Sequence, residues 1–214
     1  MKAYWFCRTN MTSPNAPRAV WTVGQQRTLR GKTIVPCSYG YHASPTLWLA
    51  LTYAPGPVAC LVELDDATLV PHGRPVDKYA ARSRTLLAAV NIERELRLFA
   101  ADCAEHVLWI YERDYPDDSR PRDAIQAARD YADGRIDAAA RDAAWAAARA
   151  AARAAAWAAA GAAARDAARD AARVAAGAAA GAAAWAAAMA AEQAWQRQQF
   201  EQRFSDLFNE ERKS

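Results

Sequence analysis

The sequence predicts an α+β fold, in which a small mixed N-terminal domain is followed by an all-α, alanine-rich helical bundle. Two observations support this prediction. Short β-rich runs separated by Pro and Gly turns occupy residues 1–91, whereas residues 138–191 contain 37 alanines in 54 positions. A chain of 214 residues is long enough for two compact units. We therefore expect an α+β domain (1–91), a connecting amphipathic helix (92–114) and an Ala-rich helical domain (115–214).

Four runs of the first domain have the composition of β-strands, because β-branched and aromatic residues are frequent in them. These runs are residues 3–7, 19–23, 58–64 and 85–90. One short helix is expected between the second and third runs, with Ser44 as its N-cap and Pro45 at its first position. Pro55 and Gly56 are expected to end that helix.

An amphipathic helix is predicted over residues 92–114, since its large apolar side chains fall on one helical stripe. The stripe consists of Leu96, Phe99, Cys103, Val107 and Ile110. Turn-forming residues follow at 115–121, and Pro121 suits the first position of the next helix. Gly134 and Asp137 are expected to end that helix and to cap another one.

Within the alanine tract, a larger or special residue recurs at every fourth position from Arg141 to Met189. Four residues advance an α-helix by about 400°, so this stripe drifts around the helix by about 40° per step. We expect the helix to break near Gly161 and near residues 177–181 and to form a compact bundle; one helix wound around a partner is the alternative. The expected core anchors are Trp145, Trp157, Trp185 and Trp195.

The arginines of this repeat are interpreted as a solvated face with neighbouring aspartates. A nucleic-acid groove is the alternative, but residues 137–191 carry a net charge of only 6 − 4 = +2. The segment 192–214 has larger apolar residues at helical spacing and is expected to close the bundle or to meet another subunit. Because alanine buries little area, such a bundle could need a second copy of the chain for stability, so a homo-oligomer is a further alternative.

The composition excludes several classes of protein. No stretch is apolar enough to span a membrane, and no signal peptide is predicted, so the expected location is cytoplasmic. The four cysteines form no CxxC pair and are expected to be reduced. For Cys37 and His42, a hydrogen-bonded structural histidine is favoured over a zinc site or a thiol nucleophile. With no assembled catalytic set, we expect no cofactor and favour a protein that is not an enzyme.

The charge of the first 62 residues is one-sided, with six Lys or Arg and no Asp or Glu. Aromatic residues are interleaved with these cations. Such a surface suits an acidic protein partner or a nucleic acid, or it is simply a basic surface over an aromatic core. The predicted partner-binding residues are Arg18, Trp21, Arg27, Arg30 and Lys32.

Two blocks of the sequence resemble known families. The C-terminal half resembles the immunity-protein family of Ala-rich helical domains. The residues that carry this resemblance are His106-Val107-Leu108, the run YPDDSRPRDAI from Tyr115 to Ile125, and the Ala-Ala-Arg and Gly-terminated turn that follow. The N-terminal part resembles a domain of unknown function common in phage and prophage proteins. Its matching residues are Cys37-x-x-Gly40-x-His42-Ala43-Ser44, Tyr53-Ala54-Pro55-Gly56 and Asp77-Lys78.

These resemblances imply an association with toxin or defence loci. The predicted function is therefore a non-enzymatic, protein-binding inhibitor or immunity-like protein of phage or mobile-element origin, which neutralises a toxin or a host-defence protein. The alternatives are nucleic-acid binding through the basic N-terminal half and a nucleotide-binding module.

The nucleotide-binding alternative rests on a third resemblance. The segment Gly-x-His-Ala-Ser, followed by a helix ending in Tyr-Ala, resembles the core of ADP-ribosyltransferase-like folds. This resemblance implies that His42, Ser44 and Tyr53 contact a bound nucleotide. The late catalytic glutamate of such transferases has no counterpart, because Glu63 lies within a predicted strand and Glu93 begins a helix. A ligand-binding relative is therefore favoured over an enzyme.

Overall fold

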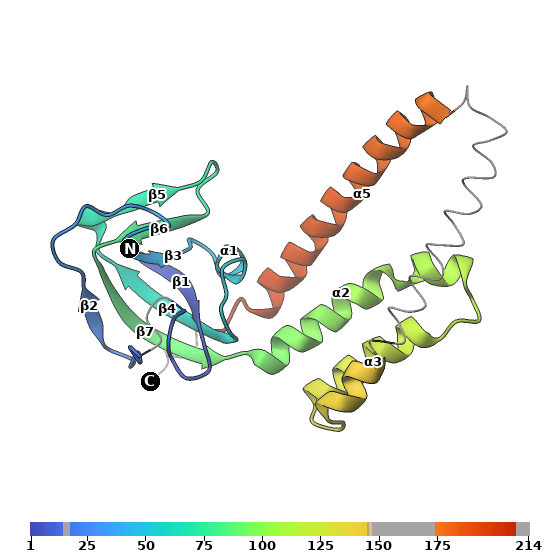
Figure 1. Cartoon of the computed structure of the whole chain (residues 1–214), viewed down its shortest axis with the longest axis horizontal. Helices are drawn as coiled ribbons and strands as arrows, with labels where there is room; N and C mark the ends of the chain where they lie inside the picture. The colour runs from blue at the N-terminus through green and yellow to red at the C-terminus, as the bar shows by residue number, and fades with distance from the viewer. Residues whose placement is uncertain (15–17, 145, 147–173, 209–214) are drawn as a thin grey trace. The chain divides into compact units, whose positions relative to one another are not determined.

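The computed structural model describes residues 1–14, 18–144, 146 and 174–208, and among these the side chains of 174–185 are not described (Figure 1). The chain divides into two compact units. The strand-rich unit contains residues 1–93 and the described residues 197–208, and the helical unit lies within residues 94–196. The predicted α+β fold class is confirmed.

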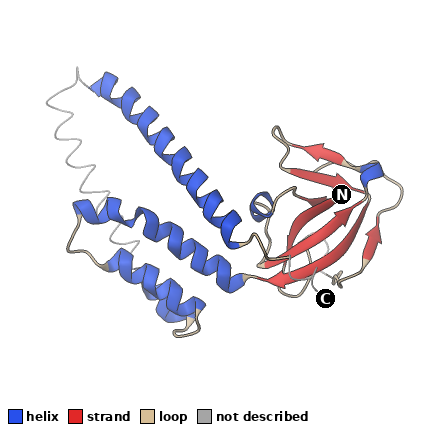
Figure 2. Ribbon diagram, turned by 180° about the vertical axis from the view of Figure 1, so that it is seen from behind, coloured by secondary structure: helices blue, strands red, loops and turns tan. Residues whose placement is uncertain are grey.

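The strand-rich unit contains two antiparallel sheets (Figure 2). A four-stranded sheet has the order β1-β4-β7-β2, and a three-stranded sheet has the order β3-β6-β5. The strands of the first sheet are β1 (Lys2–Cys7), β4 (Val58–Leu64), β7 (Ser83–Asn91) and β2 (Gln26–Thr28). The strands of the second are β3 (Tyr41–Ala43), β6 (Lys78–Ala81) and β5 (Val70–His72). The 3-10 helix η1 (Asp66–Thr68) precedes β5.

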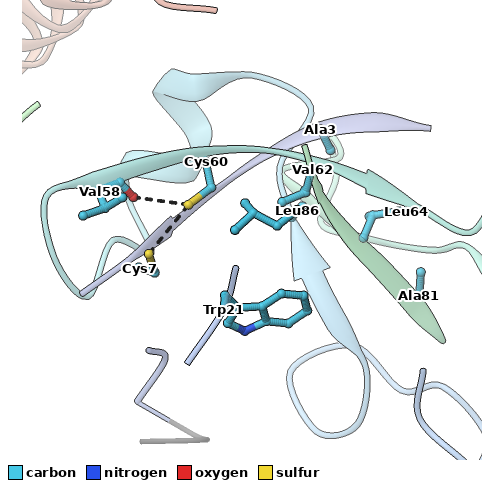
Figure 3. Close-up of a cluster of buried hydrophobic side chains, with 10 residues drawn as sticks. Ala3, Cys7, Trp21, Val58, Cys60, Val62, Leu64, Ala81 and Leu86 are labelled. Atoms are coloured by element: carbon cyan, nitrogen blue, oxygen red, sulfur yellow. Dashed lines mark hydrogen bonds between the residues drawn. The ribbon is translucent and has the colours of Figure 1, made fainter. Parts of the chain in front are cut away.

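The core of this unit lies on one face of the four-stranded sheet. Strands β1 and β4 place alternate small and apolar side chains there, and β7 adds Leu86. Trp21 enters the same cluster from a loop and is 3% exposed (Figure 3). The buried members are Ala3, Cys7, Trp21, Ala43, Val58, Cys60, Val62, Leu64, Ala81 and Leu86. The presence of Ala43 and Ala81 shows that the second sheet contributes to this core.

The opposite face of β1 carries Tyr4 and Phe6, because side chains alternate along a strand. Helix α1 (Leu47–Leu51) packs against β1. The C-terminal segment of the unit supplies further aromatic rings, with Phe200 at 5.3 Å from Trp48 and Phe208 at 6.0 Å from Tyr4 between ring centroids. Residues of β1, α1 and this segment line a pocket of about 260 Å³.

The helical unit contains α2 (Glu93–Asp114), α3 (Arg120–Ala132), a helix at residues 138–144, and most of α5 (Val174–Arg203). A small core of Ala101, Leu108 and Ile125 joins α2 to α3. On α5, the Trp195 ring stacks on His106 with centroids 3.7 Å apart and planes within 5°. No helix in the described part of the chain is both long and apolar enough to cross a membrane.

Several predicted elements are confirmed. The strand at 58–64 is β4, the runs 3–7 and 85–90 lie within β1 and β7, and the helix at 92–114 is α2. Pro121 lies in the first turn of α3. Gly134 follows α3 with a φ of +70°, and the Asp137 carboxylate accepts from the Ala140 N–H at 2.8 Å, as expected for a cap.

Three local predictions are wrong. Residues 19–23 form no strand, because the Trp21 N–H donates to the Met11 carbonyl at 2.8 Å and the ring fills the core. Thr46 caps α1, since its hydroxyl accepts from the Leu49 N–H at 3.2 Å; Ser44 lies in a β-bridge with Tyr4 instead. The expected break near residues 177–181 is absent, because α5 is continuous from 174 to 203.

Other expectations of the alanine tract lie outside the described residues. These are the anchoring roles of Trp145 and Trp157, the side chain of Trp185, the break near Gly161 and most of the repeat with period four. Of the predicted anchors, Trp195 alone is described with its side chain, and it is half-buried against His106.

Candidate functional site

The basic surface of the strand-rich unit consists of Arg18, Arg27, Arg30 and Lys32, all of them predicted partner-binding residues. Arg18, Arg30 and Lys32 are exposed, whereas Arg27 is half-buried. The Arg27 guanidinium lies 4.5 Å from the ring centroid of Trp21. Within the part of the chain that the structure describes, none of these four cations forms a salt bridge. Their charge is therefore not neutralised by the described carboxylates.

Hydrogen bonds from Arg82 and Tyr39 hold the loop that carries Arg30 and Lys32. Arg82 donates to the Leu29 carbonyl at 3.4 Å and to the Lys32 carbonyl at 3.1 Å. The Tyr39 hydroxyl donates to the Arg30 carbonyl at 2.9 Å. These bonds fix the backbone of the loop before any partner arrives, which reduces the entropy lost on binding.

Trp21 differs from the other predicted partner-binding residues, because its ring is buried. It makes edge-to-face contacts with Trp5 at 5.8 Å and with Tyr41 at 5.6 Å between centroids. Its ring also supports Arg27. A role in partner binding stays a prediction for Trp21, and in this structure it would act through the arginine stacked on it.

His42 lies in β3, and both its ring and its backbone are hydrogen-bonded. Its Nε2 accepts from the Cys37 N–H at 2.9 Å, and its carbonyl accepts from Arg84 Nη1 at 2.9 Å. Burial lowers the pKa of His42, and the charges of Lys78 and Arg84 lower it further. The neutral, hydrogen-bonded imidazole is thus the favoured form, in agreement with the structural role expected from the sequence.

A polar cluster, the Asp77 cluster, is formed by Tyr53, His72, Asp77 and Lys78. The Tyr53 hydroxyl donates to one carboxylate oxygen of Asp77, and His72 Nδ1 lies 3.0 Å from the other. The Lys78 ammonium lies 3.9 Å from the Tyr53 ring centroid. His72 and Lys78 are direct partners in the β5–β6 pairing, so their side chains share one face of the sheet.

The electrostatics of the Asp77 cluster follow from these contacts. The hydrogen bond from Tyr53, and then the one from His72, lower the pKa of Asp77. The hydrogen bond between Tyr53 and Asp77 also raises the pKa of Tyr53. Burial lowers the pKa of Lys78, but a hydrogen bond with Cys37 and nearby negative charge outweigh it and raise the value. The cluster therefore presents an ionised carboxylate that is already hydrogen-bonded and an ammonium without a salt bridge among the described residues.

The three predicted ligand-binding residues lie in different surroundings. Tyr53 is 46% exposed and belongs to the Asp77 cluster. His42 is coupled to that cluster through the charge of Lys78. Ser44 is 2% exposed, and its backbone pairs with Tyr4 through two hydrogen bonds of 2.8 Å. Ligand binding by all three remains a prediction.

Sequence reasoning missed the roles of His72 and Arg84. The turn that brings His72 to Asp77 is not evident from composition. Arg84 is 4% exposed and lies on the core-facing side of β7, in register with Leu64. The available signal was its position two residues before the buried Leu86, because residues two apart on a strand lie on the same face of the sheet.

The described residues of the strand-rich unit present several charged and aromatic groups at the surface. Among the described residues, no group of three or more His, Cys, Asp or Glu side chains could hold a metal ion. Cys37 is exposed, and its backbone N–H donates to His42 Nε2. What the unit presents is a preorganised basic surface and a small polar cluster.

Comparison with known families identifies the second half of the chain. The model of the family described as Imm-5 like putative immunity protein matches residues 87–203, which is more than half of the sequence. The match begins within β7 and extends through α2 and α3 to the end of α5. The chain belongs to this family of immunity-like proteins.

The family match leaves residues 1–86 outside it, and these residues make up most of the strand-rich unit. No curated protein and no solved structure matches the chain significantly. The basic surface and the Asp77 cluster both lie in this part of the chain.

Proposed function

We propose that this chain is a non-enzymatic inhibitor of phage or mobile-element origin, which binds and neutralises a toxin or a host-defence protein. Membership of the immunity-like family supports the role. We place the partner-binding surface at the basic surface, because its exposed cations have no carboxylate partners among the described residues. An acidic patch on the partner would supply them.

The composition of the surface also supports a protein partner. Arginine and aromatic residues contribute most of the binding energy in many protein interfaces. Here Arg27 is stacked on Trp21, and Lys32 lies 5.9 Å from the Tyr39 ring centroid. Complementary charge chiefly raises the rate of association, whereas the stacked and buried groups contribute to the lifetime of the complex.

The test compares two triple variants that remove the same amount of charge. One is Arg18→Gln, Arg30→Gln and Lys32→Gln on the basic surface. The matched control is Arg113→Gln, Arg122→Gln and Arg197→Gln, which are exposed arginines paired with carboxylates. Affinity capture from cells with the native gene neighbourhood, after nuclease treatment, first identifies the partner.

Titration of the purified partner then measures the affinity. We expect the basic-surface variant to bind about tenfold or more weakly and the control to bind as the wild type does. The basic variant should also lose protection in a growth assay against the partner. Equal affinities for the two variants would remove the basic surface from the interface, and capture that depends on nucleic acid would favour the nucleic-acid alternative.

A second candidate function is the binding of a small phosphate-bearing ligand, such as a nucleotide, at the Asp77 cluster. It is favoured by the contact between Tyr53, which the sequence predicts as a ligand-binding residue, and the cationic Lys78. The probe is ADP-ribose in a calorimetric titration. Binding that is present in the wild type and lost in Lys78→Met, but kept in Lys2→Met, supports this function. No heat at millimolar ligand would contradict it.

A further inference from the structure

Two thiols and a guanidinium share the core-facing side of the four-stranded sheet. Cys60 pairs with Trp5 across β1 and β4, and Cys7 lies two residues beyond Trp5 on the same face. Arg84 pairs with Leu64, which is on the face of Cys60 because four residues separate them along β4. The strand register therefore gathers three chemically reactive or charged groups in an otherwise apolar core.

The two thiols are in contact and inaccessible to solvent. Cys7 and Cys60 are each 0% exposed, and their Sγ atoms lie 3.6 Å apart (Figure 3). Cys60 Sγ also lies 3.7 Å from the Val58 carbonyl, and Cys7 Sγ lies 3.8 Å from Met11 Sδ, so each thiol has a second acceptor within reach besides the other thiol. The hydrogen bond from Cys60 lowers the pKa of Cys7, and the charge of Arg84 acts in the same direction. Of the two thiols, Cys7 is therefore the one that ionises more readily.

Among the described residues, no carboxylate supplies the counter-charge that buried Arg84 would need. Its guanidinium carbon lies 3.7 Å from the ring centroid of Trp5, 4.5 Å from that of Trp21 and 5.2 Å from that of Tyr41. Its Nη1 bonds the His42 carbonyl, but its buried Nε has no hydrogen-bond partner among the described residues.

No described carboxylate forms a salt bridge with Arg84. Burial of an unpaired charge is costly, so such a group needs an explanation. The nearby thiols are the groups that can provide an anion.

We propose that Cys7 and Cys60 form a redox-active dithiol, which has Arg84 as its counter-ion when reduced and which oxidises to an intramolecular disulfide. The inference does not depend on the proposed inhibitor function. Oxidation requires the Sγ atoms to approach from 3.6 Å to about 2.05 Å. Because β1 is an edge strand and Cys7 is its last residue, local opening of β1 gives an oxidant access.

The oxidant is a low-molecular-weight disulfide, and the reaction is thiol–disulfide exchange. The Cys7 thiolate attacks one sulfur of the oxidant, which forms a mixed disulfide and releases one small thiolate. That thiolate takes the proton of Cys60. The Cys60 thiolate then attacks the Cys7 sulfur, which forms the Cys7–Cys60 bond and releases the second small thiolate.

The second small thiolate is protonated by water, and the Cys7 proton had already passed to solvent when its thiolate formed. In total, the protein loses two electrons and two protons, and the oxidant becomes two thiols.

The experiment uses the full chain, treated with oxidised glutathione and then alkylated and digested for mass spectrometry. We expect a Cys7–Cys60 cross-linked peptide that is fully reversed by dithiothreitol. The double variant Cys37→Ser and Cys103→Ser should behave in the same way. Cys60→Ser should instead stop at a mixed disulfide on Cys7. The cross-link closes a separation of 53 residues, so the oxidised chain should also melt at a higher temperature.

Arg84 is tested separately as the counter-ion. Arg84→Met should slow the exchange about three- to tenfold, because less thiolate is present while the remaining thiolate is a better nucleophile. Arg113→Met, which removes an exposed arginine paired with Asp114 on α2, is the control and should leave the rate nearly unchanged. If Arg84→Met does not fold, Arg84→Lys replaces it and should retain most of the rate.

Three results would overturn the proposal. The first is an absence of the Cys7–Cys60 peptide under conditions in which exposed Cys37 is fully modified. The second is a cross-link that involves Cys37 or Cys103 instead. The third is an equal exchange rate in Arg84→Met and the wild type, which would overturn the part of the proposal that makes Arg84 the counter-ion.

Discussion

The positively charged side chains have different partners in the two units of this protein. In the helical unit, arginines are paired with carboxylates: Arg129 contacts Asp102 at 2.8 Å and Glu105 at 2.6 Å, and Arg122 contacts Glu112 at 2.7 Å. In residues 1–93, by contrast, no described Lys or Arg forms a salt bridge, and several of these cations lie against aromatic rings.

This difference indicates which unit can contribute more to the binding of an acidic partner. A paired arginine must lose its own carboxylate before it can bind another one, so its net contribution to binding is small. An unpaired cation on a fixed loop has no such competitor. The strand-rich unit therefore has charge available for recognition, and its own stability does not rely on Lys or Arg salt bridges among the described residues.

The largest test of this comparison is Trp21→Ala. Removal of the buried ring leaves a cavity beside Trp5 and Tyr41 and takes away the support of Arg84, so we expect a loss of about 3–5 kcal/mol in the free energy of unfolding. Chemical denaturation of the full chain measures it. The control is Trp109→Ala on α2, which is 62% exposed and should cost less than about 0.5 kcal/mol. Equal losses would show that the strand-rich unit is not stabilised mainly by its aromatic core.

A smaller effect is expected at the N-terminus of α1, where the neutral hydroxyl of Thr46 caps the helix. Thr46→Ala removes the bond to the Leu49 N–H and should destabilise the chain by about 1 kcal/mol. Thr52→Ala, at the other end of the same helix, is the matched control. A loss that appears only in Thr52→Ala would mean that the cap has been assigned to the wrong residue.

The ion pairs of the helical unit should each contribute less. Arg129→Gln is expected to cost about 1 kcal/mol or less, since Arg129 is partly exposed and its pairs with Asp102 and Glu105 are screened by solvent. The difference from the wild type should shrink in concentrated salt, and Arg18→Gln should show no loss at either salt concentration. Thermal melts at two ionic strengths are sufficient. A loss at Arg129 that salt does not alter would point to packing rather than charge.

The smallest effect concerns Asp77, the described carboxylate at the centre of its cluster in the strand-rich unit. Its folded-state pKa is lowered by Tyr53 and His72 from an ordinary value of 3.8. This contribution to stability is present above that value and disappears as the pH falls through the lower, folded-state pKa. Asp77→Asn should therefore be less stable than the wild type at neutral pH, and the two should converge in acid. Glu63→Gln serves as the control, and parallel pH profiles for wild type and Asp77→Asn would contradict the assignment.

The elements that could be predicted from sequence were those with a pattern of their own. β4 is a run of seven apolar-rich residues and α2 has a long amphipathic stripe, so both were predicted close to their observed bounds. β2, β3 and β5 have three residues each and exist because of their pairing partners, which no local pattern encodes. Residues 19–23 show the converse, because a strand-like composition there serves to place Trp21 in the core.

The same limit applies to the candidate site. The sequence indicated the cations of the basic surface, because the absence of acidic residues is visible without a fold. It also indicated Tyr53, but the contact with Asp77 spans 24 residues and depends on the β5–β6 turn. For Arg84, the charge itself suggested a surface residue, whereas the register of β7 with β4 buries it.

The strand-rich unit is discontinuous in sequence, and this has a consequence during synthesis. Phe200 and Phe204 are 1% and 7% exposed in that unit, with Phe200 against Trp48, but the ribosome makes the 103 residues from 94 to 196 first. At translation rates of about 5–20 residues per second, this interval lasts roughly 5–20 s. Throughout that time, Trp48 lacks its aromatic neighbour and offers an apolar surface to chaperones. Residues 197–208 thus complete a unit whose other residues are made before the helical unit.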